Sequence, residues 1–314
     1  MSGPDGSLAV VTIVHGRHEH LERQLWGLRR QDHRPDTHVV VAMDDPGVEA
    51  VARRHRGDWD VHVAATARRD GHLPLAAARN LGVDVAARAG ADRVVLLDVD
   101  CIPSRGLVGR YAGVLATLGR RRPDVARSQS PSGPDHEPQH AVPVGAPVPT
   151  VLAGEVAYLP PPPTGRDYRD LGLESLEVLA DPHPARPVLS PDEVRPATDL
   201  RLFWSLSFAL TVRDWRAVGG FDEGYVGYGG EDTDFGQRLG AASGRLLWVG
   251  GARAHHQHHP TSSPPVQHVD DVVANANRFA ERWGWWPMEG WLEAFAARGL
   301  AARTTDGRWQ ATPR

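Results

Sequence analysis

Short apolar runs alternate with amphipathic segments from residue 8 to about residue 130, and this alternation allows few folds. The apolar runs are typical of buried strands, and the segments between them repeat Leu or Ala at helical spacing. We predict strands at 8–16, 38–45, 61–66 and 93–100, and helices near 18–28, 49–56, 73–90 and 107–118. Strand and helix in turn predict an α/β fold whose parallel sheet carries helices on both faces.

The fourth predicted strand ends in Asp98, Val99 and Asp100. Alternation along a strand sends residues i and i+2 to the same side, so both carboxylates can face one ligand. Oxygen-rich clusters suit Mg²⁺ or Mn²⁺, and such ions usually bridge to substrate phosphates. The pair therefore indicates a metal site and a nucleotide-linked substrate, while a polar strand end without an ion is the alternative.

Ligands of open parallel sheets bind outside the carboxyl ends of the strands. Polar side chains gather at three of these predicted ends: His15, Gly16 and Arg17 after the first strand, Asp44 and Asp45 after the second, and Asp98 and Asp100 after the fourth. Their convergence favours a binding site at this edge.

Composition excludes several classes of protein. The net charge is −4 and the basic residues are all Arg, so there is no basic footprint for nucleic acid. The single cysteine, Cys101, rules out an internal disulfide and fits a reducing cytoplasm. The N-terminus lacks the pattern of a signal peptide, and no run of about 18 apolar residues predicts a membrane span. Peripheral contact with a membrane stays open.

The character of the chain changes between about 128 and 200, where proline is dense. Proline blocks regular helix and central strand, so we predict a long irregular excursion with one short helix near 171–179. A lid and a surface insertion without a catalytic role are equally good interpretations. After residue 200 the pattern becomes regular again, with a strand near 246–251 and two amphipathic helices at the end.

Five motifs together are more specific than any one of them. They are ARNLG at 78–82, LLDVD at 96–100, GGFDE at 219–223, GYGGEDTDF at 227–235 and a His-rich segment at 252–260. This combination resembles the GT-A class of glycosyltransferases, in particular the large inverting family 2 and the galactosyltransferases that carry G-W-G-G-E-D. The resemblance implies a Rossmann-like, mostly parallel sheet flanked by helices, with a C-terminal acceptor-binding region.

The same resemblance suggests how the chain is divided. Residues 1–130 would form the nucleotide-sugar-binding half and 131–200 an insertion or lid. Residues 201–270 would form the acceptor and catalytic half of the same domain, followed by C-terminal helices at 271–314. Four tryptophans lie near the end, and we favour their anchoring the terminal helices over stacking on sugars: Trp283, Trp285, Trp286 and Trp291.

The resemblance also implies a metal-assisted reaction. Asp100 would bind Mn²⁺ or Mg²⁺ directly, and Asp98 would reach the ion through water or contact the ribose. A third ligand is expected from the His-rich segment, where His256 and His259 have the H-x-x-H spacing of similar proteins. We favour His256; His255 and His258 are the other candidates, and a solvated loop is the structural alternative.

For the second half of the site, the resemblance makes Asp232 the general base and Glu231 a hydrogen-bonding partner of the acceptor sugar. A base that deprotonates the hydroxyl as it attacks the anomeric carbon gives single displacement with inversion. The alternative is that both carboxylates only cap a helix. Tyr228 stands where the galactosyltransferase motif has Trp, and Thr233 where a third acidic residue is frequent, so the acceptor stays open between carbohydrate, lipid-linked sugar, small molecule and protein.

The donor, a nucleotide sugar with UDP as the favoured nucleotide, would bind the first half. Residues 15–17 would line the nucleotide pocket, and Asp44 or Asp45 would accept hydrogen bonds from uracil or ribose. Arg79 and Asn80 would face the diphosphate. Two other functions compete with a hexosyltransferase: a sugar-phosphate nucleotidyltransferase, whose Gly-rich phosphate loop is missing after the first strand, and a non-catalytic sugar- or nucleotide-binding protein.

Overall fold

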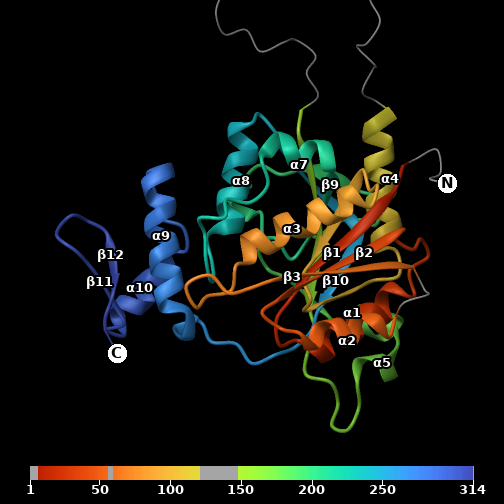
Figure 1. The fold of residues 1–314 in the computed structure, drawn as a ribbon, viewed down its shortest axis with the longest axis horizontal. Helices are drawn as coiled ribbons and strands as arrows, with labels where there is room; N and C mark the ends of the chain where they lie inside the picture. The colour runs from red at the N-terminus through yellow and green to blue at the C-terminus, as the bar shows by residue number, and fades with distance from the viewer. Residues whose placement is uncertain (1–5, 56–58, 121–147, 314) are drawn as a thin grey trace, which may run out of the picture.

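The computed structural model describes residues 6–55, 59–120 and 148–313, which form a large mixed sheet covered by helices (Figure 1). The strands follow one another across the sheet in the order β3 (Asp60–Thr66), β2 (Thr37–Met43), β1 (Leu8–Val14), β4 (Arg93–Leu97), β9 (Ser207–Thr211), β6 (Thr150–Tyr158), β10 (Arg245–His256) and β5 (Cys101–Pro103). Strand β9 is antiparallel to both of its neighbours, while β1 to β4, β6 and β10 run in one direction. The predicted mostly parallel sheet is confirmed.

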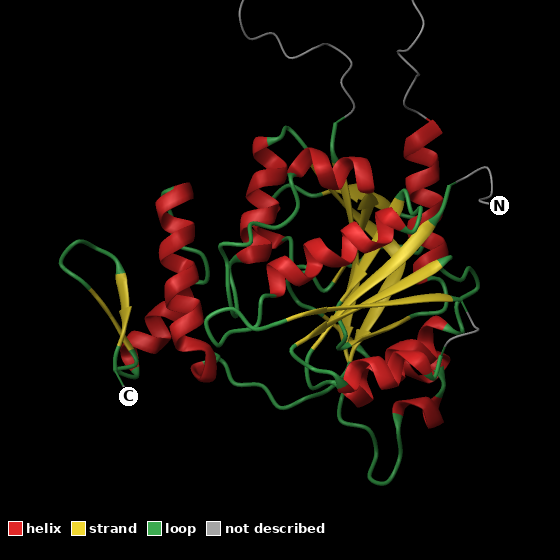
Figure 2. Ribbon diagram, in the orientation of Figure 1, coloured by secondary structure: helices red, strands yellow, loops and turns green. Residues whose placement is uncertain are grey.

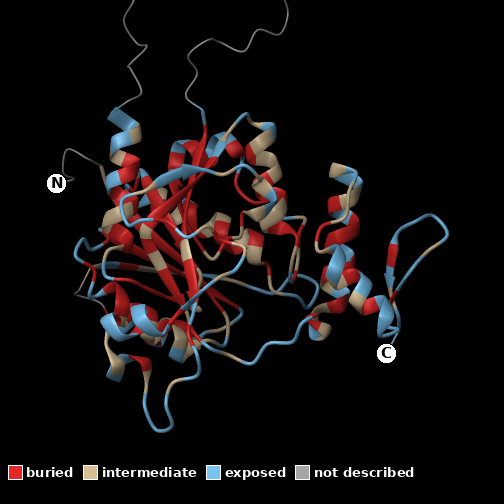
Figure 3. Cartoon of the chain, turned by 180° about the vertical axis from the view of Figure 1, so that it is seen from behind, coloured by how far each residue is buried: buried red, intermediate tan, exposed pale blue. Residues whose placement is uncertain are grey.

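Helices cover both faces of the sheet, as the alternating pattern predicts (Figure 2). One face packs against α3 (Leu75–Arg88), α7 (Val212–Val218) and α8 (Glu231–Ala241). The opposite face packs against α1 (His18–Leu28), α2 (Gly47–Arg53) and α4 (Leu107–Arg120). Figure 3 shows that burial concentrates on the strands and on the inner sides of these helices.

The predicted irregular excursion is wrong for residues 150–158. These residues form β6, which lies inside the sheet between β9 and β10. Their sequence is free of proline and rich in apolar residues, so it fits a buried strand. Gly154 allows a close approach, because a Cβ there would lie 2.0 Å from the Ala252 carbonyl at an irregularity of β10. Residues 128–147 of the excursion lie outside the described ranges.

The rest of the described excursion contains short elements separated by loops. They are α5 (Tyr168–Leu171), α6 (Leu173–Leu179), β7 (Asp181–Pro182), β8 (Val194–Pro196) and the 3-10 turn η1 (Leu200–Leu202). Helix α6 lies at the predicted short helix. Strands β7 and β8 add to β6 and β10 respectively, so the excursion is attached to the sheet at several points.

The C-terminal elements form a separate layer beside α8 (Figure 1). They are the 3-10 turn η2 (Val266–His268), α9 (Val269–Trp283), α10 (Glu289–Ala297), β11 (Ala301–Arg303) and β12 (Trp309–Ala311). The two helices are as predicted, and the small β11–β12 hairpin is an additional feature. Trp283 does anchor α9, since its Nε1 donates to the fully buried Asp234 on α8 over 2.9 Å. Within the described ranges, none of the helices combines the length and the apolar character needed to cross a membrane.

Candidate active site

The two aspartates after β4 lie on a tight turn instead of on the strand. Strand β4 ends at Leu97, and the Cys101 amide donates to the Asp98 carbonyl over 2.9 Å. Strand alternation therefore does not position these two carboxylates, and a ligand shared by them stays a prediction. Asp98 faces inward and lines a small cavity together with Arg79. Asp100 faces the end of β10.

Two buried glutamines hold the backbone of this turn. The side chain of Gln24 on α1 donates to the carbonyls of Asp98 (2.7 Å) and Cys101 (3.1 Å). Gln257 lies directly after β10. Its side chain donates to the Val99 carbonyl (3.3 Å), and its backbone amide donates to the Asp100 carbonyl (2.7 Å). Neither glutamine is exposed. All four carbonyls of residues 98–101 thus accept hydrogen bonds, which positions the turn against α1 and β10.

Three side chains converge beside the turn in an arrangement that can hold a metal ion. Asp100, His256 and His259 each offer one ligand atom, and these atoms all lie within 4.8 Å of one another. The His259 Nε2 is 3.3 Å from Asp100 Oδ2. Asp100 Oδ1 lies 3.5 Å from Arg17 Nε and 3.7 Å from His20 Nε2, and among the described residues it has no hydrogen-bond partner. A buried carboxylate oxygen that accepts no hydrogen bond from the described residues is suited to a cation.

The two histidines differ in how readily they can bind a metal ion. Burial lowers the pKa of His256 to about 4, which keeps the imidazole neutral and its lone pair available. The hydrogen bond to Asp100 raises the pKa of His259, so a metal ion has to displace a proton from this imidazole. For Asp98, burial and the neighbouring Asp100 charge raise the pKa to about 6. Asp98 does not belong to the three-residue cluster, so a direct bond from it to the ion finds no support in the geometry.

The other two histidines of the segment are directed elsewhere. His255 is fully buried, and its Nε2 lies 2.8 Å from Glu177 Oε2 on α6. His258 is exposed, and its backbone amide donates to the Tyr168 hydroxyl over 3.2 Å. The alternation along β10 separates His255 from His256, so only the H-x-x-H pair faces Asp100.

Asp45 closes the loop between β1 and α1. Its carboxylate accepts hydrogen bonds from the amides of Gly16 (2.7 Å) and Gly47 (3.0 Å). It also lies 2.8 Å from His18 Nε2. These contacts lower its pKa even though burial acts in the opposite direction. The carboxylate shapes this loop, and its contact with a nucleotide stays a prediction.

Asp44, His15 and Arg17 remain at the strand ends as expected. Asp44 is half exposed, and its carboxylate lies 2.8 Å from the Nε of Arg68. Arg68 also reaches His15 Nε2 at 3.0 Å, so the three side chains form one cluster. Our sequence analysis missed Arg68, although it follows the third predicted strand by two residues and the rule for strand ends applies to it equally.

A second pair of carboxylates begins α8. Glu231 is buried and its Oε1 accepts from Arg79 over 3.0 Å, while Asp232 accepts from the Thr233 amide over 2.7 Å. Burial and the adjacent Glu231 charge raise the pKa of Asp232 to about 7, and Arg79 acts in the opposite direction. Because Arg79 also lowers the pKa of Asp98, its charge acts on both halves of the site. A role for Glu231 in capping is excluded, since its carboxylate is directed at Arg79.

The Asn80 side chain is hydrogen-bonded to the GGFDE loop, and its contact with a diphosphate stays a prediction. Its amide nitrogen donates to Phe221 O (2.9 Å) and to Glu223 Oε1 (2.8 Å), and its oxygen accepts from the Phe221 amide (2.8 Å). These bonds attach helix α3 to the GGFDE loop. The neighbouring Arg79 likewise has its guanidinium paired with Glu231, so its contact with a phosphate stays a prediction.

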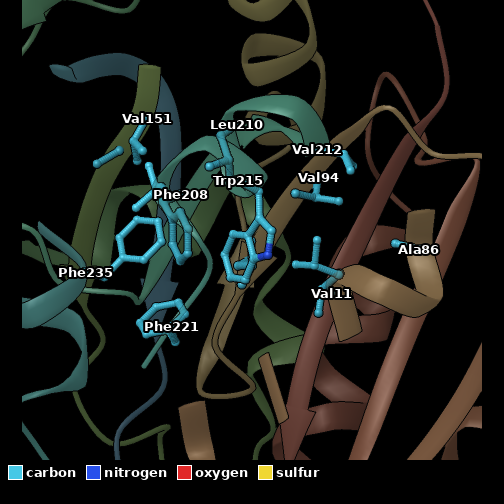
Figure 4. Packing of buried hydrophobic residues seen from close by; sticks show 14 of the residues in the cluster. Val11, Ala86, Val94, Val151, Phe208, Leu210, Val212, Trp215, Phe221 and Phe235 are labelled. Carbon is cyan, nitrogen blue, oxygen red and sulfur yellow. The ribbon is translucent and has the colours of Figure 1, made fainter. Parts of the chain in front are cut away.

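An aromatic core fixes the start of α8 (Figure 4). Phe221 of the GGFDE loop stacks on Phe235 of α8 with ring centroids 4.7 Å apart, and Trp215 and Phe208 pack around this pair. Gly230 precedes the helix with φ of +89°, a left-handed conformation that favours glycine. The GGFDE and GGED motifs therefore form one packed unit that presents Glu231 and Asp232.

The aromatic residue of the G-Y-G-G motif is exposed beside these carboxylates. Tyr228 stacks on His268 with ring centroids 4.7 Å apart, and the ring of Trp291 lies 6.1 Å away. Burial and the charges of Asp232 and Glu231 raise the pKa of Tyr228 to about 12. Tyr228, His268 and Trp291 are named the Tyr228 surface below. No sequence motif indicated His268.

Comparisons with known proteins agree with this architecture. A family model described as the N-terminal domain of galactosyltransferase matches residues 186–260, which contain the GGFDE, GGED and H-x-x-H motifs. Two solved structures are similar to this chain over 94% of its length, each with a TM-score of 0.53. They are GalNAc-T7 with UDP, GalNAc and Mn²⁺ (16% identity, 57% of that chain) and S. aureus TarS 1–349 with UDP (12% identity, 78% of that chain). The protein has the GT-A fold.

A curated relative matches a shorter stretch of this GT-A chain. Validoxylamine A glucosyltransferase of Streptomyces hygroscopicus subsp. jinggangensis (strain 5008) is 34% identical over 85 residues, which are 26% of this chain. The chain matches only 18% of that relative's length. The GT-A fold places the D-x-D turn, the H-x-x-H pair and the GGED motif on neighbouring elements, although about 150 residues separate the first from the second in the chain.

Proposed function

We propose that this chain is a metal-dependent, inverting glycosyltransferase that transfers a hexose from a UDP-linked sugar to an acceptor hydroxyl. The observation that carries the proposal is the cluster of Asp100, His256 and His259 at the turn after β4 and the end of β10. Its position at the carboxyl ends of the strands is where an open α/β sheet binds its ligand.

The donor atoms of the cluster suit Mn²⁺ better than Mg²⁺. One carboxylate oxygen and two imidazole nitrogens are available, and imidazole favours first-row transition ions, whereas Mg²⁺ prefers oxygen ligands. GalNAc-T7 was solved with UDP and Mn²⁺, which supports the same ion here. When bound, such an ion would stabilise the negative charge that develops on the leaving diphosphate.

Asp232 is proposed as the general base. A pKa of about 7 leaves the carboxylate partly ionised at neutral pH and makes it a stronger base than an ordinary aspartate. The buried ion pair between Arg79 and Glu231 holds the first turn of α8 in place. The Asp232 carboxylate removes the proton of the acceptor hydroxyl as that oxygen attacks the anomeric carbon from the face opposite the diphosphate, so the configuration inverts.

The nucleotide is proposed to bind over the loops after β1 and β2. Arg17 bridges this region to Asp100, and the cluster of His15, Asp44 and Arg68 supplies donors and acceptors for base or ribose. The two solved structures with UDP support uridine as the nucleoside. The single cysteine is a buried free thiol, and we place the reaction in the cytoplasm.

The acceptor is proposed to bind against the Tyr228 surface. Its stacked rings offer apolar faces beside Asp232 and Glu231, and such faces pack against the C–H surfaces of sugar-like rings. The relative named validoxylamine A glucosyltransferase makes validoxylamine A the first acceptor to try.

The test is a transfer assay with purified protein, a panel of UDP- and GDP-hexoses and a panel of small sugar and cyclitol acceptors. We expect release of UDP that requires Mn²⁺, stops with EDTA and gives a product of inverted anomeric configuration by NMR. Transfer that proceeds equally in EDTA would contradict metal dependence, and retained configuration would contradict the role of Asp232. If the protein neither binds nor turns over any nucleotide sugar of the panel, the proposed function is wrong.

A further inference from the structure

Arg186, in the loop between β7 and β8, carries a buried charge that forms no ion pair with a carboxylate of the described residues. Its residue is 6% exposed, and one guanidinium nitrogen, NH2, donates to the Trp204 carbonyl over 3.0 Å. The other two nitrogens, Nε and NH1, have no hydrogen-bond partner among the described residues and no contact with solvent. Burial lowers the pKa of Arg186 to about 10, so the side chain remains protonated at neutral pH.

The other buried arginines of the described ranges have carboxylate partners. Arg79 lies 3.0 Å from Glu231, and Arg93 lies 3.6 Å from Asp92. Around Arg186 there are aromatic rings instead: its guanidinium carbon is 4.7 Å from the centroid of Trp248 and 5.6 Å from that of Trp204. Cation–π contacts offset part of the cost of burying a charge, but proteins rarely leave one without an opposite charge.

A layer of half-buried rings connects Arg186 to the candidate metal cluster. The Trp204 ring contacts His183 (centroids 4.6 Å apart), His183 contacts Tyr158 (5.4 Å), and Tyr158 contacts His256 (4.7 Å). Arg186 therefore lies behind this layer of rings, at the end opposite His256 of the cluster. A low-dielectric layer of this kind weakens a charge interaction much less than water does.

One peptide unit also joins Arg186 to the proposed base. The carbonyl of Trp204 accepts from Arg186, and the backbone amide of the next residue, Ser205, lowers the pKa of the Asp232 carboxyl. The positive charge acts on Asp232 as well, since Asp232 is among the groups that raise the pKa of Arg186. Both relationships place the guanidinium within electrostatic reach of the reacting groups.

We propose that Arg186 is the fixed positive charge that binds the anionic part of the donor, the nucleotide diphosphate, across the ring layer of Tyr158, His183 and Trp204. This inference rests on the proposed function, because it takes a nucleotide diphosphate as the ligand. Arg186 acts on the ligand's charge through space, so it is a binding residue for the diphosphate and not for the nucleoside. The negative charge of the bound diphosphate would offset the buried positive charge of Arg186.

The test compares three ligands of different charge, namely UDP, inorganic pyrophosphate and uridine, by calorimetry in buffer with Mn²⁺. We expect Arg186→Gln to weaken binding of UDP and pyrophosphate at least tenfold and to leave uridine unchanged. Arg186→Lys, which keeps the charge, should stay within about threefold of wild type. The matched control is Arg195→Gln on β8, whose side chain is half exposed and paired with Glu193, and it should change nothing.

Several results would overturn the inference. The first is that Arg186→Gln binds UDP as tightly as the wild type does. The second is that Arg186→Gln loses as much affinity for uridine as for UDP. The third is that Arg186→Lys loses as much affinity for UDP as Arg186→Gln does. If Arg186→Gln does not fold, Arg186→Met removes the same charge and keeps an apolar stem. Failure of both variants to fold would show that the charge serves folding and not a ligand. Failure of the wild-type protein to bind UDP or any other nucleotide diphosphate would instead contradict the proposed function.

Discussion

The backbone amide of Gln257 donates to the carbonyl of Asp100 over 2.7 Å. This bond joins the end of β10 to the turn after β4, and therefore joins the segment with the two clustered histidines to the aspartate they face. The Gln257 side chain adds bonds to Val99 O (3.3 Å) and His20 O (3.1 Å). The geometry of the candidate metal cluster thus depends on a residue that supplies no ligand atom to it.

Replacement of Gln257 by Leu should weaken metal binding. The change leaves two buried carbonyls without this donor, and an unsatisfied buried group costs about 1–3 kcal/mol. We expect a lower free energy of unfolding by about that amount in urea denaturation and a several-fold weaker affinity for Mn²⁺. The exposed Gln267→Leu is the control. Unchanged Mn²⁺ affinity in Gln257→Leu would argue against a positioning role.

The histidines should separate into two groups. His256→Ala and His259→Ala each remove a proposed ligand and should weaken Mn²⁺ binding at least tenfold, with a matching loss of transfer rate. His258→Ala, exposed and directed away from Asp100, should behave like wild type in both measurements. Equal effects of all three substitutions would mean that the cluster is not the metal site.

The transfer rate should rise with pH around neutrality. A base must be ionised to accept a proton, and the pKa of Asp232 is raised to about 7, so kcat should increase from pH 6 to pH 8 and then level. In Asp232→Asn, kcat should fall about 10²–10⁴-fold and should no longer depend on pH in this range, while the affinity for UDP stays unchanged. Asp84→Asn on the exposed side of α3 serves as the control. A rate for Asp232→Asn near that of wild type would rule out the base assignment.

Arg79 and Glu231 should be coupled in stability. Both side chains are buried, so Arg79→Met leaves the Glu231 charge unpaired and should lower the free energy of unfolding by about 3–5 kcal/mol. Adding Glu231→Gln removes that charge and should restore much of the loss, measured by urea denaturation in a double-mutant cycle. Arg88→Met, exposed on the same helix, should have little effect. Additive losses in the cycle would show that the two side chains do not depend on each other.

Much of the first half could be predicted because its helices and strands are regular. Apart from the short strand β5, the order of strands and helices up to α4 follows from hydrophobic periodicity, and so does the edge at which the polar residues gather. The D-x-D turn and the bonds of Asn80 could not be predicted, because they depend on partners at residues 257 and 221, far along the chain. Spacing in sequence does not show which side chain a distant loop will contact.

The strand β6 shows the opposite difficulty. Dense proline on both sides of residues 150–158 concealed a short proline-free run, which is long enough for a central strand once β9 and β10 supply neighbours. Arg186 lies in the same stretch and carried no motif. Its unusual character is visible only in three dimensions, where aromatic rings and not carboxylates surround the guanidinium.

The most direct test of the proposed metal site is to measure Mn²⁺ binding in the presence of UDP through the decrease of the EPR signal of free Mn²⁺. We expect the wild-type protein to bind one Mn²⁺ per chain and the double variant His256→Ala/His259→Ala to bind none. Both proteins should have the same fold by circular dichroism. Equal Mn²⁺ binding by the two proteins, or none by the wild type with UDP present, would contradict the proposed metal site.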